Sequence, residues 1–281
     1  MSLPDFLIIG SMKCGTSTLQ TQLAAQTNIY MTTPKEPNFF SDDAIYANGL
    51  DWYKGLFAGA KPYDLKGEAS THYTKLPTYP DCIDRMSNVL DSPKLIYMIR
   101  NPLARAVSHY IHEWTMGEMS GDIEAAFKKH PELIAYGQYA MQIEPYIKKF
   151  GRDRILLTSL ENLKSDPHGT LTEIGRFLEI ERPLIWQSEM SRVNASAERI
   201  RRFPLQELVF DNPIATKIRR TLVPRRIRDW IKSGRQMSER PQLSFELSQR
   251  LEAVFAEDRV KLQKLFPNYD GLERGYRFSC K

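Results

Sequence analysis

The sequence predicts an α/β fold in which a central parallel sheet is flanked by helices, so that three layers are formed. Short apolar runs alternate with helix-like stretches along the chain, which is the pattern of consecutive βαβ units. The first apolar run leads directly into a turn bracketed by glycines, as in folds with a phosphate-binding P-loop. With 281 residues, 42% of them hydrophobic, the chain can bury one sizeable core, and we expect a single domain over residues 1–281.

Strands are predicted where apolar residues run together, at residues 6–9, 63–69, 94–99 and 154–158. A helix is predicted at residues 16–25, others begin near residues 80, 102, 135 and 165, and a long last helix covers residues 244–266. Pro102 supports one of these boundaries, because proline favours the first turn of a helix. The order of these elements predicts a P-loop-like three-layer fold.

Composition argues against a membrane-spanning, secreted or metal-binding protein. No apolar run approaches the roughly 20 residues of a membrane span, and the first predicted strand follows Met1 too closely for a signal peptide. We therefore expect a cytoplasmic protein. Cys14, Cys82 and Cys280 are widely scattered and show no C-x-x-C spacing, so we expect free thiols and neither a disulfide framework nor a zinc site.

The excess of positive charge lies in one segment, residues 192–240, which holds 13 Lys and Arg against 5 Asp and Glu, a net charge of +8. Isoleucines recur there near helical spacing among arginines, so we predict a basic helical appendage or lid. Such a stretch can contact an anionic membrane surface or face an acidic substrate. The alternative is a solvated face of packed helices.

Gly10 and Gly15 bracket four residues, as in a nucleoside-triphosphate P-loop, but the lysine lies inside the bracket, at Lys13. In the triphosphate loop the lysine follows the second glycine and reaches the outer phosphates, and Thr16 holds that position here. A strand, a glycine turn and a helix start direct backbone N–H groups at one anion. Lys13 can therefore neutralise a phosphate or leaving group near the turn, which suits a shorter anhydride than a triphosphate. The alternative is a hydroxyl-capped helix start that binds nothing.

A second candidate anion site begins where the strand at 94–99 gives way to Arg100 and a helix opens at Pro102. Its predicted core stripe is Leu103, Val107, Tyr110 and Trp114. Ser108 lies off this stripe, where its hydroxyl and the Arg100 side chain can bind the same anion. The planar guanidinium of arginine, with its several N–H donors, suits a phosphate. A magnesium-dependent NTPase would end such a strand in an aspartate, so we expect no metal ion here. The alternative is a structural ion pair for Arg100 and a solvent-facing Ser108.

Residues 13–18, KCGTST, and residues 100–110, RNPLARAVSHY, together resemble two motifs of the 3′-phosphoadenosine 5′-phosphosulfate (PAPS)-dependent sulfotransferases. The first is similar to the family's loop for the phosphosulfate end of PAPS, and the second to its R-x-P-x-x-R-x-x-S-x-Y element for the ribose 3′-phosphate. The similarity continues through residues 35–40 (KEPNFF), 67–73 (GEASTHY), 137–142 and the last helix. It covers most of the chain and is greatest toward the heparan sulfate type and its bacterial relatives.

This resemblance implies transfer of a sulfuryl group from PAPS to an acceptor hydroxyl without a metal ion, and adenosine 3′,5′-bisphosphate as the product. The cofactor-binding residues implied by the two motifs are Lys13, Cys14, Gly15, Thr16, Ser17, Thr18, Arg100 and Ser108. Lys13 would also stabilise charge on the bridging oxygen of the leaving group. A sugar hydroxyl is the implied acceptor, with glycolipids and other small alcohols behind it, and nucleic acid is not an expected partner.

Three residues are candidates for acid–base or acceptor roles. In the heparan sulfate type a glutamate three residues before a Phe-Phe pair acts as the base, which implies that role for Glu36. His72 is a rival base, because the cytosolic branch of the family uses a histidine near this strand end. Glu68 either lines the acceptor site or pairs with a surface cation, and Ala69 stands where the relatives usually have a lysine.

The family's late K-G-R loop over the ribose phosphate is matched only loosely, by Lys232, Ser233, Gly234 and Arg235. Gly234 and Arg235 are therefore further candidate cofactor contacts. Paired cysteines of the kind found in lumenal relatives are absent from the sequence, as expected of a bacterial-type enzyme.

Two other classes stay open. A small-molecule kinase would explain the glycine spacing, with Glu68 in place of the usual metal-binding aspartate, but it would lack the usual lysine. A non-catalytic nucleotide- or polyanion-binding module would explain the basic segment, but it leaves Glu36 without a role.

Overall fold

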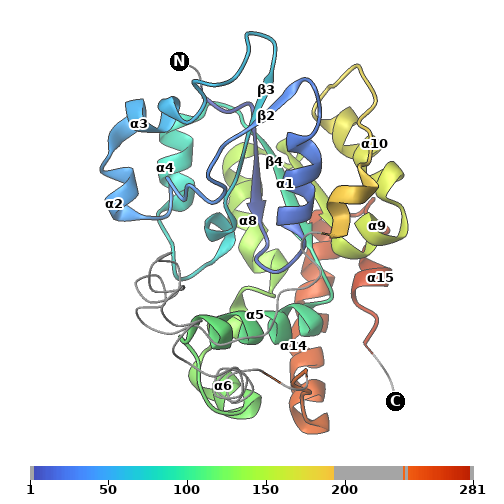
Figure 1. Ribbon diagram of the computed structural model, residues 1–281. Coiled ribbons are helices and arrows are strands. Elements are labelled where there is room, and N and C mark those ends of the chain that lie inside the picture. Colours follow the sequence, from blue (N-terminus) through green and yellow to red (C-terminus); the bar gives the residue numbers. More distant parts are fainter. Residues whose placement is uncertain (1–2, 193–236, 238–239, 279–281) are drawn as a thin grey trace, which may run out of the picture.

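A five-stranded sheet forms the centre of the protein, and every neighbouring pair of its strands is parallel. The computed structural model describes residues 3–192, 237 and 240–278 (Figure 1). The strands are β1 (Phe6–Gly10), β2 (Ile29–Met31), β3 (Leu65–Ala69), β4 (Lys94–Ile99) and β5 (Ile155–Ser159). They lie in the order β2-β3-β1-β4-β5. The predicted α/β fold with a parallel central sheet is confirmed.

The four predicted strands are all present, and their ends move by at most two residues. The sequence does not reveal β2, because three residues are too few to show an apolar run. The two strands at the centre of the sheet carry the core: residues 6–9 of β1 and 95–99 of β4 are all buried. Burial on both faces is why these strands read as unbroken apolar runs rather than as alternating patterns.

Helices cover both faces of this sheet, and Figure 1 shows α1 on one side and α8 on the other. The longer helices are α1 (Thr16–Ala24), α4 (Cys82–Val89), α5 (Pro102–Met116), α8 (Tyr139–Phe150), α10 (Pro167–Phe177) and α14 (Phe245–Leu265). The shorter ones are α2 (Asp43–Tyr46), α3 (Gly49–Gly55), α6 (Ile123–Lys129), α7 (Glu132–Ala135), α9 (Leu160–Ser165) and α15 (Leu272–Gly275), with 3-10 turns η1 (Thr71–Thr74), η2 (Arg152–Arg154) and η3 (Ser188–Arg192). Within the described part of the chain, no helix is long and apolar enough to span a membrane.

Side-chain caps explain where several helices begin. The Asn101 side chain accepts a hydrogen bond of 2.9 Å from Ala104 N, and Pro102 follows it as the first residue of α5. Asp166 caps α10 in the same way, through Gly169 N at 2.8 Å, so the helix predicted to begin near residue 165 is α10, which begins at Pro167. The helix predicted to begin near residue 135 is α8, which begins at Tyr139, and the sequence does not predict the short helix α7 before it.

Two polar contacts fix the parts of the chain on either side of residues 193–236. Before that segment, the Gln22 side chain of α1 exchanges two hydrogen bonds of 2.8 Å with the backbone of Gln187. After it, the buried Asp258 of α14 accepts hydrogen bonds from Ala140 N at 3.0 Å and Met141 N at 3.3 Å, at the start of α8. Helix α14 therefore packs as part of the same core as α8.

Several sequence-based predictions fall outside the described residues. The basic appendage or lid predicted at 192–240 lies there almost entirely, as do Lys232, Ser233, Gly234, Arg235 and Cys280. Cys14 and Cys82 are free thiols, as predicted, and both are buried.

The carboxyl ends of four adjacent strands bring the predicted site segments to one edge of the sheet. β1 runs into the glycine-bracketed loop at 10–15, and β4 ends next to Arg100. β2 leads into residues 32–40, and β3 leads into η1. Because crevices at the carboxyl edge of parallel sheets are the usual ligand sites, this edge is where the candidate site lies.

Candidate active site

The loop between β1 and α1 ends in a helix start that no side chain caps. Gly15 has φ of 90° and precedes Thr16, the first residue of α1, which has no acidic residue in its first turn. A Cβ on Gly15 would lie 2.7 Å from Leu160 Cδ1, so both conformation and space favour glycine here. The first backbone N–H groups of the helix, at Thr16, Ser17 and Thr18, have no intrahelical partner. This arrangement is suited to an anion.

Two cationic side chains lie beside this helix start. Arg100 Nη1 donates to the backbone oxygen of Lys13 over 3.2 Å, so the arginine lies against the loop. Burial lowers the pKa of the Lys13 ammonium, and the charge of Arg100 lowers it further. Neither cation forms an ion pair with a carboxylate in the described part of the chain. Unpaired cations held close together fit a multiply charged anion such as a phosphosulfate, and argue against Arg100 in a structural ion pair.

Helix α5 buries more of its surface than the predicted stripe, of which Leu103 and Trp114 are partly buried against the core. Val107 and Tyr110 are buried as expected, but Arg105 and His109 are buried as well. The Arg105 guanidinium donates to the Leu133 backbone oxygen and lies 3.4 Å from His109 Nδ1. The second arginine of the RNPLARAVSHY stretch is thus a core residue. Ser108 is only half-buried, on the less covered side of the helix.

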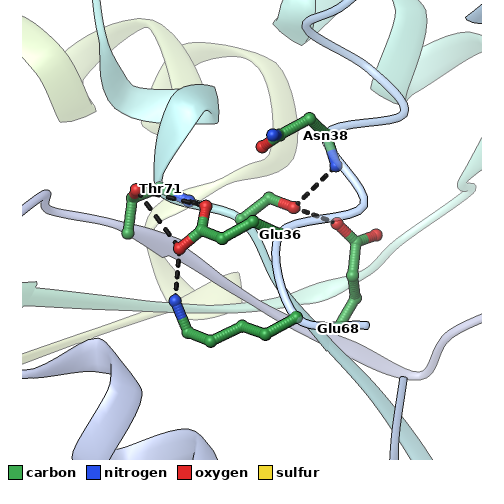
Figure 2. Close-up of polar contacts among 6 residues, drawn as sticks. Glu36, Asn38, Glu68 and Thr71 are labelled. Carbon is green, nitrogen blue, oxygen red and sulfur yellow. Dashed lines mark hydrogen bonds and ion pairs between the residues drawn. The ribbon is translucent and has the colours of Figure 1, made fainter. Parts of the chain in front are cut away.

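Glu36 sits in the loop after β2, where its carboxylate is held by three donors (Figure 2). Oε2 accepts hydrogen bonds from Thr71 N at 2.7 Å and Thr71 Oγ1 at 3.2 Å, and Oε1 is paired with the Lys35 ammonium. Glu36 has φ of 59°, an uncommon conformation for a residue with a side chain. Its backbone N–H donates to Ala69 O at the end of β3. The carboxylate is therefore oriented by the neighbouring strand.

The Phe-Phe pair after Glu36 anchors this loop in the core. Phe39 stacks on Tyr53 of α3, with ring centroids 4.3 Å apart and planes 7° from parallel. Phe40 packs against Tyr53 and Tyr73, and all four rings are buried. The motif E-x-x-F-F thus has a physical basis, because two buried rings fix the position of a carboxylate that stays accessible.

Glu68 is not part of the accessible site, so the prediction that it lines the acceptor site or pairs with a surface cation is wrong. Its side chain is completely buried. It accepts hydrogen bonds from Tyr73 Oη at 2.6 Å, from Ser70 Oγ at 2.7 Å and from Tyr53 Oη. Burial raises the pKa of this carboxyl, and its three hydroxyl partners oppose that shift. A group so enclosed cannot hold a nucleotide-bound metal ion either.

The Glu68 cluster instead supports the loop that carries Glu36 (Figure 2). Ser70 Oγ donates to Glu68 and accepts from the backbone N–H of Asn38 over 3.1 Å. Asn38 has φ of 55°, the second such residue in this loop. Glu68 is thus connected through one serine to the backbone two residues from Glu36.

His72 follows Thr71 in η1 and is half-buried. Its ring stacks on Tyr79, with centroids 4.7 Å apart. Burial, together with the charge of Lys75, lowers the pKa of His72 to about 4. The ring is therefore neutral at pH 7, and it has lost the proton affinity near neutral pH that makes histidine a common general base.

A cavity of about 470 Å³, here called the histidine pocket, opens beside η1 and beside the loop at 10–15, here called the phosphate loop. It is lined by Met12, by side chains from residues 72–79, by the second half of α5 and the turn after it, and by residues 130–136. Four of the five histidines of the chain line it: His72, His109, His112 and His130. Sequence reasoning singled out only His72. The i, i+3 spacing of His109 and His112 on one helix was a signal for part of this pocket.

Comparison with known proteins identifies the class. Residues 3–265 match the sulfotransferase domain family, so the chain belongs to that family. Members of this family use PAPS as the sulfuryl donor. The resemblance predicted from the two motifs is thereby confirmed.

Two kinds of relative support this assignment. Heparan sulfate glucosamine 3-O-sulfotransferase 3B1 of Mus musculus is 31% identical over 192 residues, which cover 64% of this chain and 47% of the relative. The bifunctional heparan sulfate N-deacetylase/N-sulfotransferase 1 of Caenorhabditis elegans is 24% identical over 195 residues, 64% of this chain and 22% of the relative. The chain thus spans about half the length, or less, of these relatives.

A sulfotransferase from Alicyclobacillus acidocaldarius has the same fold, with a TM-score of 0.67 and 24% identity over 98% of this chain and 100% of that one.

Proposed function

We propose that this protein transfers the sulfuryl group of PAPS to a hydroxyl group of an acceptor, most simply a sugar or glycolipid. The proposal depends on two features that lie at one edge of the sheet. The first is the uncapped start of α1, flanked by Lys13 and Arg100, and the second is the oriented carboxylate of Glu36. Sulfuryl transfer needs both parts: positive charge at the donor and a proton acceptor at the hydroxyl.

The residues at the loop fit the donor. The N–H groups and hydroxyls of residues 16–18, with Lys13, would hold the phosphosulfate, and Arg100 would hold a phosphate on the ribose, with Ser108 as a further candidate. When bound, PAPS supplies the sulfuryl group and an adenosine 3′,5′-bisphosphate leaving group. The Lys13 ammonium would donate to an oxygen of the bound donor at the turn, where positive charge would stabilise the leaving oxygen.

Glu36 is the proposed base. Thr71 and Lys35 orient its carboxylate, and it can accept the proton of an acceptor hydroxyl placed beside it. His72 is a weaker candidate, because its pKa of about 4 leaves little drive to take a proton at neutral pH. A cytoplasmic location, and contact of the basic segment at 192–240 with an anionic membrane, remain part of the proposal.

The test is a thermal-shift titration in a metal-chelating buffer. Adenosine 3′,5′-bisphosphate at about 100 times its Kd should stabilise the native chain by about 2.7 kcal/mol. Transfer of label from [35S]PAPS to an acceptor mixture then tests the chemistry. A larger shift with magnesium-ATP and none with the bisphosphate would favour the kinase alternative. Binding without transfer to any acceptor would favour a nucleotide-binding module.

A further inference from the structure

The histidine pocket touches both halves of the proposed reaction centre. Met12, next to Lys13 in the phosphate loop, forms part of its wall, and so does His72, next to the Thr71 that holds Glu36. An acceptor hydroxyl must reach the place where donor and base meet. A molecule seated in this pocket can present a hydroxyl there while the rest of it occupies the cavity.

Lys75 gives this pocket an ammonium that has no carboxylate partner among the described residues. The side chain is only 9% exposed and lines the cavity, with its ammonium 5.8 Å from the centroid of the Tyr136 ring. Burial lowers its pKa to about 8, against the opposing charges of Glu36 and Glu113. No carboxylate of the described residues lies within ion-pair distance of it. An ammonium has three N–H donors, and the contact of this one with the face of the Tyr136 ring leaves donors from which a ligand oxygen in the pocket can accept.

The remaining charge in the pocket is negative. Three carboxylates line it: Glu113, Glu118 and Glu132. Hydrogen bonding to His109, 3.3 Å from Glu113 Oε1, lowers the pKa of Glu113, so this carboxylate is ionised at neutral pH. The histidines do not balance this charge in full, because burial lowers the pKa of both His72 and His109 to about 4.

The other walls are apolar or aromatic. Three methionines and the rings of Tyr79 and Tyr136 contribute to the lining. No group of three or more His, Cys, Asp or Glu side chains in the described part of the chain has the geometry to hold a metal ion. A sugar could bind such a pocket in two ways. Its hydroxyls would exchange hydrogen bonds with the neutral imidazoles, the carboxylates and the ammonium, and its apolar face would pack on the aromatic rings.

We propose that the histidine pocket binds the acceptor, and that this acceptor is an uncharged sugar, held by a hydrogen bond from Lys75 to one of its oxygens. The proposal rests on the proposed function and narrows its substrate. A polyanionic glycan, such as the one in the names of the heparan sulfate relatives, would bring negative groups to three carboxylates and one ammonium. Like charges on the walls of a binding site disfavour such a ligand.

The experiment uses the full chain, saturating PAPS and three tetrasaccharides that differ in charge: an N-acetylglucosamine tetramer, which is uncharged, its de-N-acetylated form, which carries amines, and a heparosan tetramer, which carries carboxylates. We expect kcat/KM for the uncharged tetramer to exceed that for heparosan by about tenfold or more. A preference for heparosan, or for the amine form, would overturn the proposal. In either case the transfer itself would leave the sulfotransferase function intact.

If no product forms, calorimetry measures how tightly the same three tetrasaccharides bind to the chain loaded with the bisphosphate. Selective binding of the uncharged form supports the proposal, and its absence overturns it. Failure of the bisphosphate to bind at all is a different result, because it contradicts the proposed function.

Two variants test the residues. Lys75→Met should raise KM for the uncharged tetramer by about tenfold and leave the thermal shift with the bisphosphate unchanged, whereas Lys75→Arg should restore much of the loss. Lys61→Met, at an exposed site, is the control. Glu118→Lys, also exposed, should narrow the preference for the uncharged tetramer over heparosan several-fold. Unaltered KM in Lys75→Met together with an unaltered preference in Glu118→Lys would refute the assignment.

Discussion

The backbone N–H of Thr71 donates to Oε2 of Glu36 over 2.7 Å, so the first residue of η1 holds a carboxylate that belongs to the loop after β2. These two segments are 35 residues apart in the chain and meet because β2 and β3 are adjacent parallel strands. The contact fixes one oxygen of the carboxylate. The strand pairing thereby determines the direction in which the proposed base can take a proton.

Replacing Glu36 with Gln tests its assignment as the base. Glutamine keeps the shape and can still accept from Thr71, so binding of adenosine 3′,5′-bisphosphate should persist. Turnover should fall by roughly a hundredfold or more, the usual contribution of a positioned base. Steady-state kinetics and thermal shift measure the two properties separately. Near-normal turnover would transfer the role of base to His72.

Replacing Lys13 with Ala should impair both binding and turnover, unlike the change at Glu36, because the Lys13 side chain is proposed to contact the donor before and during transfer. We expect weaker binding of the bisphosphate together with a lower kcat. Arg100 also lies against this loop, so some affinity should remain. A variant that bound the bisphosphate normally and lost only kcat would restrict Lys13 to the leaving oxygen.

The serine between Glu68 and the Glu36 loop can be removed with little change in volume. Ser70→Ala breaks the contacts with Glu68 and with Asn38 N, and should cost about 1–3 kcal/mol of unfolding free energy. If the cluster positions Glu36, kcat should fall about tenfold while the bisphosphate binds normally. Thr170→Val removes a buried hydroxyl far along the chain and is the control. Equal kcat in both variants would reduce Ser70 to a purely structural residue.

Acid should destabilise the native state through the buried histidines. The pKa of His109 is about 4 in the native state and 6.5 ordinarily, so between these values the unfolded chain binds more protons. The contribution of His109 to the free energy of unfolding, on the order of 3 kcal/mol, is fully present above pH 6.5 and is lost as the pH falls toward 4. Asp258, whose pKa is raised to about 6 by burial, acts in the opposite direction.

Urea unfolding of the wild type and of His109→Gln at pH 7.5 and pH 5 separates these effects, since Asp258 is common to both chains. The loss of stability between the two pH values should be smaller in the variant. Equal losses would mean that His109 titrates alike in both states.

Gly15→Ala tests the phosphate loop. A Cβ there would approach Leu160 Cδ1 to 2.7 Å, and φ is 90°. We expect a loss of about 1–2 kcal/mol of stability from the backbone conformation alone, and weaker binding of the bisphosphate. Adding Leu160→Ala relieves the clash but not the backbone strain, so binding should recover only in part. Full recovery would show that the clash alone mattered.

The elements that could be predicted from the sequence are those with local signals. Four of the five strands and the loop at 10–18 depend on neighbouring residues, and they appear where predicted, within two residues. The burial of Glu68 could not be predicted from such local signals, because its hydrogen-bond partners include Tyr53, 15 residues earlier in the chain. The histidine pocket gathers residues from 12 to 136. No periodic pattern in the sequence can predict such a cluster. Arg105 was also not predictable as a core residue, since a charged side chain can be buried when a backbone oxygen accepts its hydrogen bond.

The hydrogen bonds of Asp258 to the start of α8 have a consequence for how the chain can be divided. Residues 241–278 are joined to the rest of the described chain through packing and such contacts, as well as through the peptide chain. A single cut anywhere within 193–236 would therefore leave two polypeptides that share one core. We expect them to co-elute in gel filtration and to separate only in denaturant, so that the two pieces, produced independently, should assemble into one folded protein.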